Sequence, residues 1–104
     1  MIKELNDSNF AEVTSQGVVM VDFWAVWCGP CRALAPHVEA IAEEYEGRVV
    51  VGKLDIEASE KVAMELGIRA IPTIIFFKNG EIVDRTTGLV NKKVLAEKLD
   101  ALLA

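Results

Sequence analysis

The sequence has few of the residues that small proteins use for covalent cross-links or for metal binding. Its 104 residues include two cysteines and one histidine. Small secreted domains are held together by a framework of several disulfides, and a structural zinc site takes four cysteine or histidine ligands. The composition therefore argues against both kinds of domain, and we expect no bound metal.

Positive charge and long apolar runs are also scarce. Lys and Arg number 11 against 16 Asp and Glu, which gives a net charge of −5. Because nucleic-acid binding needs a basic face, we expect no nucleic-acid partner. No apolar run approaches the roughly 20 residues that span a bilayer, and no signal peptide is visible behind Met1. We expect a cytoplasmic monomer with no membrane partner.

Apolar residues, by contrast, make up 52% of the chain, and charged residues make up 26%. This balance allows a folded core, and the length fits one domain over residues 1–104. Residues 18–25 are apolar almost throughout, as in a strand covered on both faces. Leu34, Val38, Ile41 and Tyr45 recur at helical spacing and predict the buried stripe of a helix.

Strand-like and helix-like segments alternate along the chain. The predicted strands are residues 2–5, 18–25, 49–55 and 73–77 and a segment with Ile82 and Val83 that is broken by Gly88. The predicted helices run from Asp7 or Ser8 to about residue 15, from Cys28 to about Gly47, from Ser59 to residue 66 and from Asn91 to residue 103. A helix that crosses between two strands makes them parallel, whereas Asn79-Gly80 predicts a hairpin between antiparallel strands. We therefore predict an α/β fold, a mixed central sheet with helices on both faces.

Both cysteines belong to one motif, Trp27-Cys28-Gly29-Pro30-Cys31, between the apolar strand and the long helix. Two cysteines in a turn that joins a strand to a helix indicate a dithiol–disulfide redox site. One alternative is a zinc site made of both cysteines and His37. Such a site would have too few ligands, because zinc usually takes four. Another is a purely structural disulfide, which would close too short a loop to stabilise the fold much. We otherwise interpret His37, which lies off the apolar stripe, as a surface residue with no role.

Segments along most of the chain resemble the thioredoxin family. The resemblance implies the thioredoxin-like fold and a protein-disulfide reductase, a thiol–disulfide oxidoreductase that passes two electrons from Cys28 and Cys31 to a target disulfide. It implies disulfide-containing target proteins, no bound cofactor other than the Cys28–Cys31 disulfide, and recycling by a separate thioredoxin reductase. The matching segments are Asp22-Phe23-Trp24, Trp27-Cys28-Gly29-Pro30-Cys31, Ala35-Pro36, Lys53-Leu54-Asp55, Ile71-Pro72-Thr73, Phe77-Lys78-Asn79-Gly80 and Gly88.

Two other functions fit the same scaffold. One is a non-catalytic partner subunit, and the other is a thiol oxidase or isomerase. An intact motif argues against the first as the sole role. The dipeptide Gly29-Pro30, which accompanies reductants in the thioredoxin family, argues against the second.

Cys28 lies where the long helix begins. Unpaired backbone N–H groups and the helix dipole favour an anion there. We therefore expect the pKa of the Cys28 thiol to be lower than that of a free cysteine, and Cys28 to attack. Cys31 lies one turn deeper on the same helical face, placed to resolve the mixed disulfide. Gly29 leaves room for a partner chain, and Pro30 suits the first helical turn.

Asp22 lies in an otherwise apolar strand, so burial should raise its pKa. Either it is hydrogen-bonded and inert, or it exchanges a proton with Cys31, which is the role that the resemblance favours. Lys53 shares one face of its strand with Val49, Val51 and Asp55. Its amine either turns toward Asp22 and tunes it, or reaches water while its stem packs.

The resemblance also implies a second loop around Pro72, whose peptide bond is cis in thioredoxins and which faces both cysteines. Backbone groups beside such a proline could pair with an extended target strand, and the ring would keep metal ions away from the sulfurs. Val26 and Thr87 depart from the commonest thioredoxin pattern, which bears on target preference. The predicted target-binding residues are Trp27, Ala70, Ile71, Thr73, Gly88 and Leu89.

Overall fold

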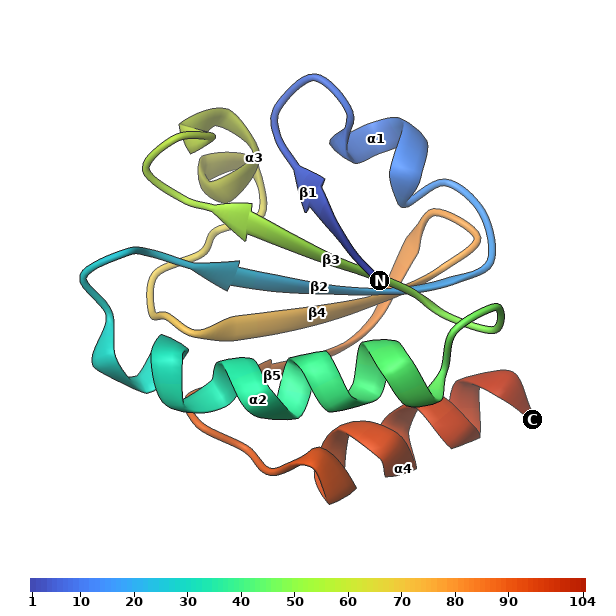
Figure 1. The fold of residues 1–104 in the computed structure, drawn as a ribbon. Coiled ribbons are helices and arrows are strands. Elements are labelled where there is room, and N and C mark those ends of the chain that lie inside the picture. The colour runs from blue at the N-terminus through green and yellow to red at the C-terminus, as the bar shows by residue number, and fades with distance from the viewer.

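The computed structural model describes all 104 residues, with strands and helices in alternation (Figure 1). The elements are β1 (Ile2–Leu5), α1 (Phe10–Val13), β2 (Val18–Trp24), α2 (Gly29–Glu44), β3 (Val50–Asp55), α3 (Glu60–Glu65), β4 (Thr73–Lys78), β5 (Glu81–Thr87) and α4 (Lys92–Leu103). The predicted order of elements is confirmed. None of the helices combines the length and apolar composition needed to cross a membrane.

The five strands form one mixed sheet in the order β1-β3-β2-β4-β5. Strands β1, β3 and β2 are parallel, whereas β4 and β5 run antiparallel to their neighbours. The parallel pair β2 and β3 is connected through helix α2, as the crossover rule requires. Strand β2 lies in the centre, which explains why its residues are apolar almost throughout.

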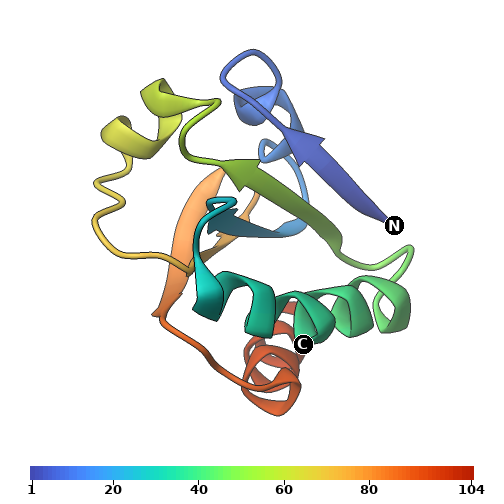
Figure 2. The ribbon, with the colours of Figure 1, turned by 60° about the vertical axis from the view of Figure 1, so that its left-hand side comes forward.

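Side chains of β2 alternate between two apolar clusters on opposite faces of the sheet. Met20 packs with residues of α2 and α4, including Leu34, Val38 and Leu95. Phe23 packs with Val62 of α3 and with Phe10 of α1 on the other face. Figures 1 and 2 show α2 and α4 on one side of the sheet and α1 and α3 on the other. The predicted arrangement of helices on both faces is confirmed.

The first helix differs from its prediction. It is a single short turn that begins after Asn9, not at Asp7 or Ser8. Asp7 instead caps α3, because its carboxylate accepts hydrogen bonds from the backbone N–H groups of Val62 (2.9 Å) and Lys61 (3.3 Å). Ser59 occupies the N-cap position of α3 as predicted, but its side chain makes no capping bond. A cap supplied from 54 residues away leaves no local pattern in the sequence.

The predicted hairpin joins β4 to β5 through Asn79 and Gly80. Both residues have positive φ, 51° and 88°, as the two central positions of a type I′ turn require. The Asn79 side chain also accepts a hydrogen bond from the Gly17 N–H group (2.9 Å), which ties the hairpin to the start of β2. Strand β5 contains the predicted Ile82 and Val83 and ends at Thr87, directly before Gly88, as predicted. A register shift with β4 lies at Phe76 and Phe77.

Candidate active site

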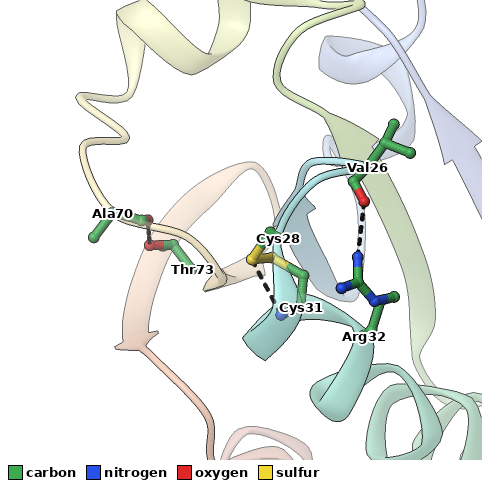
Figure 3. The surroundings of a disulfide bond; sticks show 6 residues. All are labelled: Val26, Cys28, Cys31, Arg32, Ala70 and Thr73. Atoms are coloured by element: carbon green, nitrogen blue, oxygen red, sulfur yellow. Dashed lines mark hydrogen bonds between the residues drawn. A yellow bond between two sulfur atoms is a disulfide. The ribbon is translucent and has the colours of Figure 1, made fainter.

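The two cysteines form a disulfide at the start of α2 (Figure 3). Their Cα atoms are 5.2 Å apart. The chain leaves β2 at Trp24 and turns back at once, with a hydrogen bond from the Cys28 N–H group to the Ala25 carbonyl (3.2 Å). Cys28 is the N-cap residue of α2, and its Sγ accepts a hydrogen bond from the Cys31 N–H group (3.1 Å). This sulfur therefore lies where the helix offers an anion both a donor and the positive end of its dipole.

The disulfide lies in a small apolar cluster. Cys28 and Cys31 are 4% and 5% exposed and pack with Ala25, and the half-buried Ile71 packs against this group. Both sulfurs are thus shielded from most of the solvent. Exposed side chains of the same turn, Val26 and Trp27, lie beside them in the sequence.

The turn that carries the motif is tied to the helix behind it. A guanidinium N–H of Arg32 donates to the Val26 carbonyl (3.0 Å), as Figure 3 shows. A Cβ added at Gly29 would meet only the end of the Arg32 side chain, at 3.9 Å. Nothing inside the chain therefore requires glycine at this position, and the prediction that it makes room for a partner stays open. Sequence reasoning missed Arg32, because the bond depends on the path of the turn.

Asp22 is completely buried. Alternation along β2 places it on the same face as Met20, which packs beneath α2. Neither carboxylate oxygen has a hydrogen-bond partner in the chain, so no hydrogen bond to another residue holds this aspartate. Burial raises the pKa of Asp22 from its ordinary 3.8 to about 6, and the charge of Lys53 partly offsets this rise. A carboxyl with such a pKa can exchange protons near neutral pH.

Lys53 is the residue directly beside Asp22 across the parallel pair β2 and β3. Its ammonium lies 4.9 Å from the centre of the Trp24 ring, within the range of a cation–π contact. Lys53 and Asp22 form no ion pair, yet the lysine charge lowers the pKa of Asp22. The amine is thus packed against an aromatic ring, and its charge acts on the carboxylate through space.

The loop before β4 lies against the motif, as Figure 3 shows for Ala70 and Thr73. The Ile71–Pro72 peptide bond is cis, as the resemblance implies. The carbonyl of Pro72 accepts a hydrogen bond from the Gly88 N–H group (2.8 Å), which joins this loop to the end of β5. Thr73 Oγ1 donates to the Ala70 carbonyl (2.6 Å).

The predicted target-binding residues fall into two groups. Trp27 and Leu89 are 63% and 55% exposed, Ala70 is exposed, and Ile71 and Gly88 are half-buried. Thr73 differs, because it is 3% exposed, its side chain is turned toward Ala70, and it is paired with Phe23 of β2 and Thr87 of β5. The Trp27 indole N–H donates to Glu57 (2.8 Å), which fixes the exposed ring. No signal in the sequence pointed to Glu57.

His37 is not the free surface residue that the sequence suggested. It is half-buried, and its Nδ1 accepts a hydrogen bond from the backbone N–H group of Lys92 (3.0 Å). This atom is therefore engaged inside the protein, and the cysteines are bonded to each other. No group of three or more His, Cys, Asp or Glu side chains is arranged to hold a metal ion.

Comparison with known proteins gives relatives over nearly the whole chain. Residues 1–101 match the family model described as Thioredoxin. A thioredoxin of Staphylococcus haemolyticus (strain JCSC1435) is 46% identical over 99 residues, which are 95% of this chain and 95% of that protein. Thioredoxin 2 of Chlorobaculum tepidum is 44% identical, over 93% of this chain and 91% of the relative.

The chloroplastic M-type thioredoxin of Pisum sativum is 46% identical over 95% of this chain, which spans 59% of the pea protein's length. The fold matches as well, because the mixed five-stranded sheet and its helices have the α/β arrangement that the resemblance implies. With its cysteine pair at the start of α2, the chain belongs to the thioredoxin family and is a thiol–disulfide oxidoreductase.

Proposed function

We propose that this protein reduces disulfides of target proteins, with Cys28 as the attacking thiolate and Cys31 as the resolving thiol. The observation that carries the proposal is the position of the Cys28 sulfur. It caps α2 and accepts a hydrogen bond from the Cys31 N–H group at 3.1 Å. In the reduced protein the same donor and the helix dipole favour the thiolate form of Cys28. Pro30, in the first turn of α2, fits this helix start.

The exchange runs in two steps. The Cys28 thiolate attacks one sulfur of the target disulfide, that bond breaks, and the second target sulfur leaves as a thiolate that takes up a proton. Cys31 then gives up its proton and attacks the Cys28 sulfur, which releases the first target sulfur. The target gains two electrons and two protons, and the protein is left with the Cys28–Cys31 disulfide. Because both cysteines lie on one helix, the second step is intramolecular and fast.

We assign the proton of Cys31 to Asp22. The carboxylate is buried on the face of the sheet that α2 covers, has no hydrogen-bond partner, and has a pKa of about 6. At pH 7 about nine in ten such groups are ionised, so Asp22 is ready to accept a proton. Lys53 keeps this pKa from rising further.

The surface around the disulfide supports docking of flexible protein segments. Trp27 and Leu89 are exposed apolar side chains. Gly88 precedes Leu89 on the same loop, and Ala70 and Ile71 belong to the loop before β4. Apolar rims of this kind favour protein partners, and the backbone beside Pro72 can pair with an extended strand. Val26, 65% exposed, enlarges the same surface. We therefore propose disulfide-containing proteins as the substrates.

A separate thioredoxin reductase is the proposed electron donor, and we propose the cytoplasm as the compartment, with the protein acting as a monomer that binds no further cofactor. The pea relative is named as chloroplastic, so location differs among relatives. The reduction potential of the Cys28–Cys31 pair distinguishes a reductase from an oxidase or isomerase. A value near −270 mV fits a reductase, and a value near −120 mV contradicts it.

The roles of the cysteines are tested by replacing the resolving thiol. Cys31→Ser should accumulate a covalent adduct with a disulfide-containing target such as insulin, because nothing resolves the mixed disulfide. The adduct is detected by non-reducing electrophoresis and mass spectrometry, and Cys28→Ser is the control that should give none. If Cys28→Ser forms the adduct and Cys31→Ser does not, the two roles are reversed. If neither variant traps a target, the proposed reduction of proteins fails.

A further inference from the structure

His37 connects the helix that begins at the disulfide with the loop that precedes α4. The N–H groups in the first turn of a helix have no acceptor within that helix. In α4, Asn91 accepts from the Val94 N–H group (3.1 Å). His37, from α2, accepts from the N–H group of Lys92, the first residue of α4, at 3.0 Å. An imidazole of a neighbouring helix thus completes the cap of α4.

This bond is one of several that hold the ends of the segment 88–91. At the same end, the Lys92 ammonium pairs with Glu44 of α2 at 2.8 Å, and the Asn91 carbonyl accepts from the Val94 N–H group (3.2 Å). At the other end of the segment, the Gly88 N–H group donates to the Pro72 carbonyl (2.8 Å). Pro72 follows Ile71, which packs against the cluster of Cys28 and Cys31. Figure 2 shows the segment crossing from β5 to α4 below the first turns of α2. One end is therefore fixed to the loop beside the disulfide, and the other end is fixed to the helix that carries it.

Within the segment, the residues differ in conformation and burial. Gly88 has a positive φ of 88°, and Leu89 is 55% exposed. Val90 is half-buried and packs against the core cluster under α2 and α4. An exposed leucine on a short loop contributes more to binding when its backbone is held in place, because ordering the loop on binding would otherwise weaken the complex.

We infer that His37 is a positioning residue for target binding, which holds the segment 88–91 so that Leu89 is presented beside the disulfide. The inference rests on the proposed docking role of Gly88 and Leu89. The imidazole touches Lys92 and not the sulfurs, so its contribution belongs to the binding of protein targets. The exchange of thiols itself should not depend on it.

Two variants of nearly equal shape separate the hydrogen bond from the packing. In His37→Asn, Oδ1 occupies the place of Nδ1 relative to Cβ and can accept the Lys92 N–H group. In His37→Leu, a methyl group stands there and the bond is lost, although leucine is the better helix former. A defect confined to the leucine variant therefore reports the bond and not a weakened helix. Faster hydrogen exchange of the Lys92 amide in His37→Leu alone shows directly that the bond is gone.

The readouts are KM and kcat for insulin reduction, with dithiobisnitrobenzoate as a small disulfide that needs no docking surface. His37→Leu should raise the KM for insulin about two- to tenfold, the range that the net free energy of one hydrogen bond allows. Its kcat and its rate with the small disulfide should stay at the wild-type value, and His37→Asn should restore the KM. An unchanged KM in His37→Leu, or equal increases in both variants, would overturn the inference.

A third variant, Leu89→Ser, distinguishes this inference from the function on which it rests. If Leu89→Ser raises the KM for insulin and His37→Leu does not, the docking surface stands and the role of His37 is wrong. If neither variant changes the KM, the proposed docking role of the segment fails, and the role of His37 fails with it.

Discussion

At the scale of single residues, Asp22 stands out because an ionisable side chain lies in a buried, apolar environment. It is completely buried, its oxygens have no hydrogen-bond partner, and its pKa is about 6. A buried carboxylate without partners destabilises the folded protein. We propose that the function offsets this cost, because Asp22 exchanges a proton with Cys31.

Replacing Asp22 should make stability less dependent on pH. A carboxyl whose pKa is higher in the folded than in the unfolded state binds protons more tightly when folded, so stability falls as pH rises from about 4 through 6. The shift from 3.8 to about 6 corresponds to about 3 kcal/mol at pH 8. Asp22→Asn should therefore be more stable than the wild type by up to about 3 kcal/mol at pH 8, and equally stable near pH 3.

Urea unfolding at both pH values, with both proteins in the oxidised form, measures this difference. A gain of the same size at pH 3 and at pH 8 would show that Asp22 destabilises the fold for a reason other than its charge.

At the scale of elements, the helices are completed by side chains that come from elsewhere in the chain. Asp7 caps α3, and His37 accepts the first N–H group of α4. The motif turn before α2 is held by Arg32 from within that helix. Each bond satisfies a backbone group that the helix or turn leaves without a partner, and each ties an element to its neighbour. The local patterns at Ser59 and Asn91 indicated where α3 and α4 begin. They did not indicate the bonds that Asp7 and His37 make to the first turns of these helices.

The capping of α3 by Asp7 can be tested by stability. Asp7→Ala should lower the free energy of unfolding by about 1 kcal/mol, the typical effect of losing an N-terminal cap. Asp7→Asn keeps an acceptor oxygen and should lose less than half of that. Denaturant unfolding of the three proteins measures the effect. Equal losses in both variants would assign the effect to the charge of Asp7, and no loss in either would show that the two bonds contribute nothing.

At the scale of the whole molecule, the order of strands decides which loops surround the disulfide. Strand β2 ends at the motif, and its antiparallel neighbour β4 begins at the same edge, just after Pro72. Strand β5 ends there too, because it pairs antiparallel with β4, and Gly88 follows it. Three segments far apart in sequence thus meet around one disulfide. The docking surface is a product of this topology.

Trp27 should contribute to target binding at this edge of the sheet. Trp27→Ala removes the largest exposed apolar side chain beside Cys28, and buried aromatic anchors commonly contribute 1–2 kcal/mol or more to protein complexes. We expect the KM for insulin to rise about tenfold with kcat less affected. Ile82→Ala is the matched control, because Ile82 is exposed next to the hairpin, where β2 begins and not where it ends. Equal effects of both variants would argue against a localised docking surface.

The sequence alone determined the elements and the identity of the reacting groups. Periodicity and turn residues are local signals, so the strands, the stripe of α2 and the Asn79-Gly80 hairpin were predicted within a few residues. The spacing of Cys28 and Cys31 within the motif Trp27–Cys31 indicated thiol–disulfide chemistry without any tertiary contact. Contacts between distant segments left no such signal. Glu57 against Trp27, Arg32 against Val26, and Asp7 on α3 depend on the folded path of the chain.

Tertiary structure also decided the state of each site residue. Thr73 was predicted to meet a target, but its side chain is turned inward. Asp22 could have been hydrogen-bonded, and His37 could have been free, because the sequence does not reveal which polar groups pack against a residue. Burial, pKa and hydrogen bonding arise only when the strands and helices are brought together. Short segments of this sequence therefore determine the reacting groups and the local conformation. The topology of the fold determines the burial, the pKa and the hydrogen bonds of those groups, because it brings distant segments together.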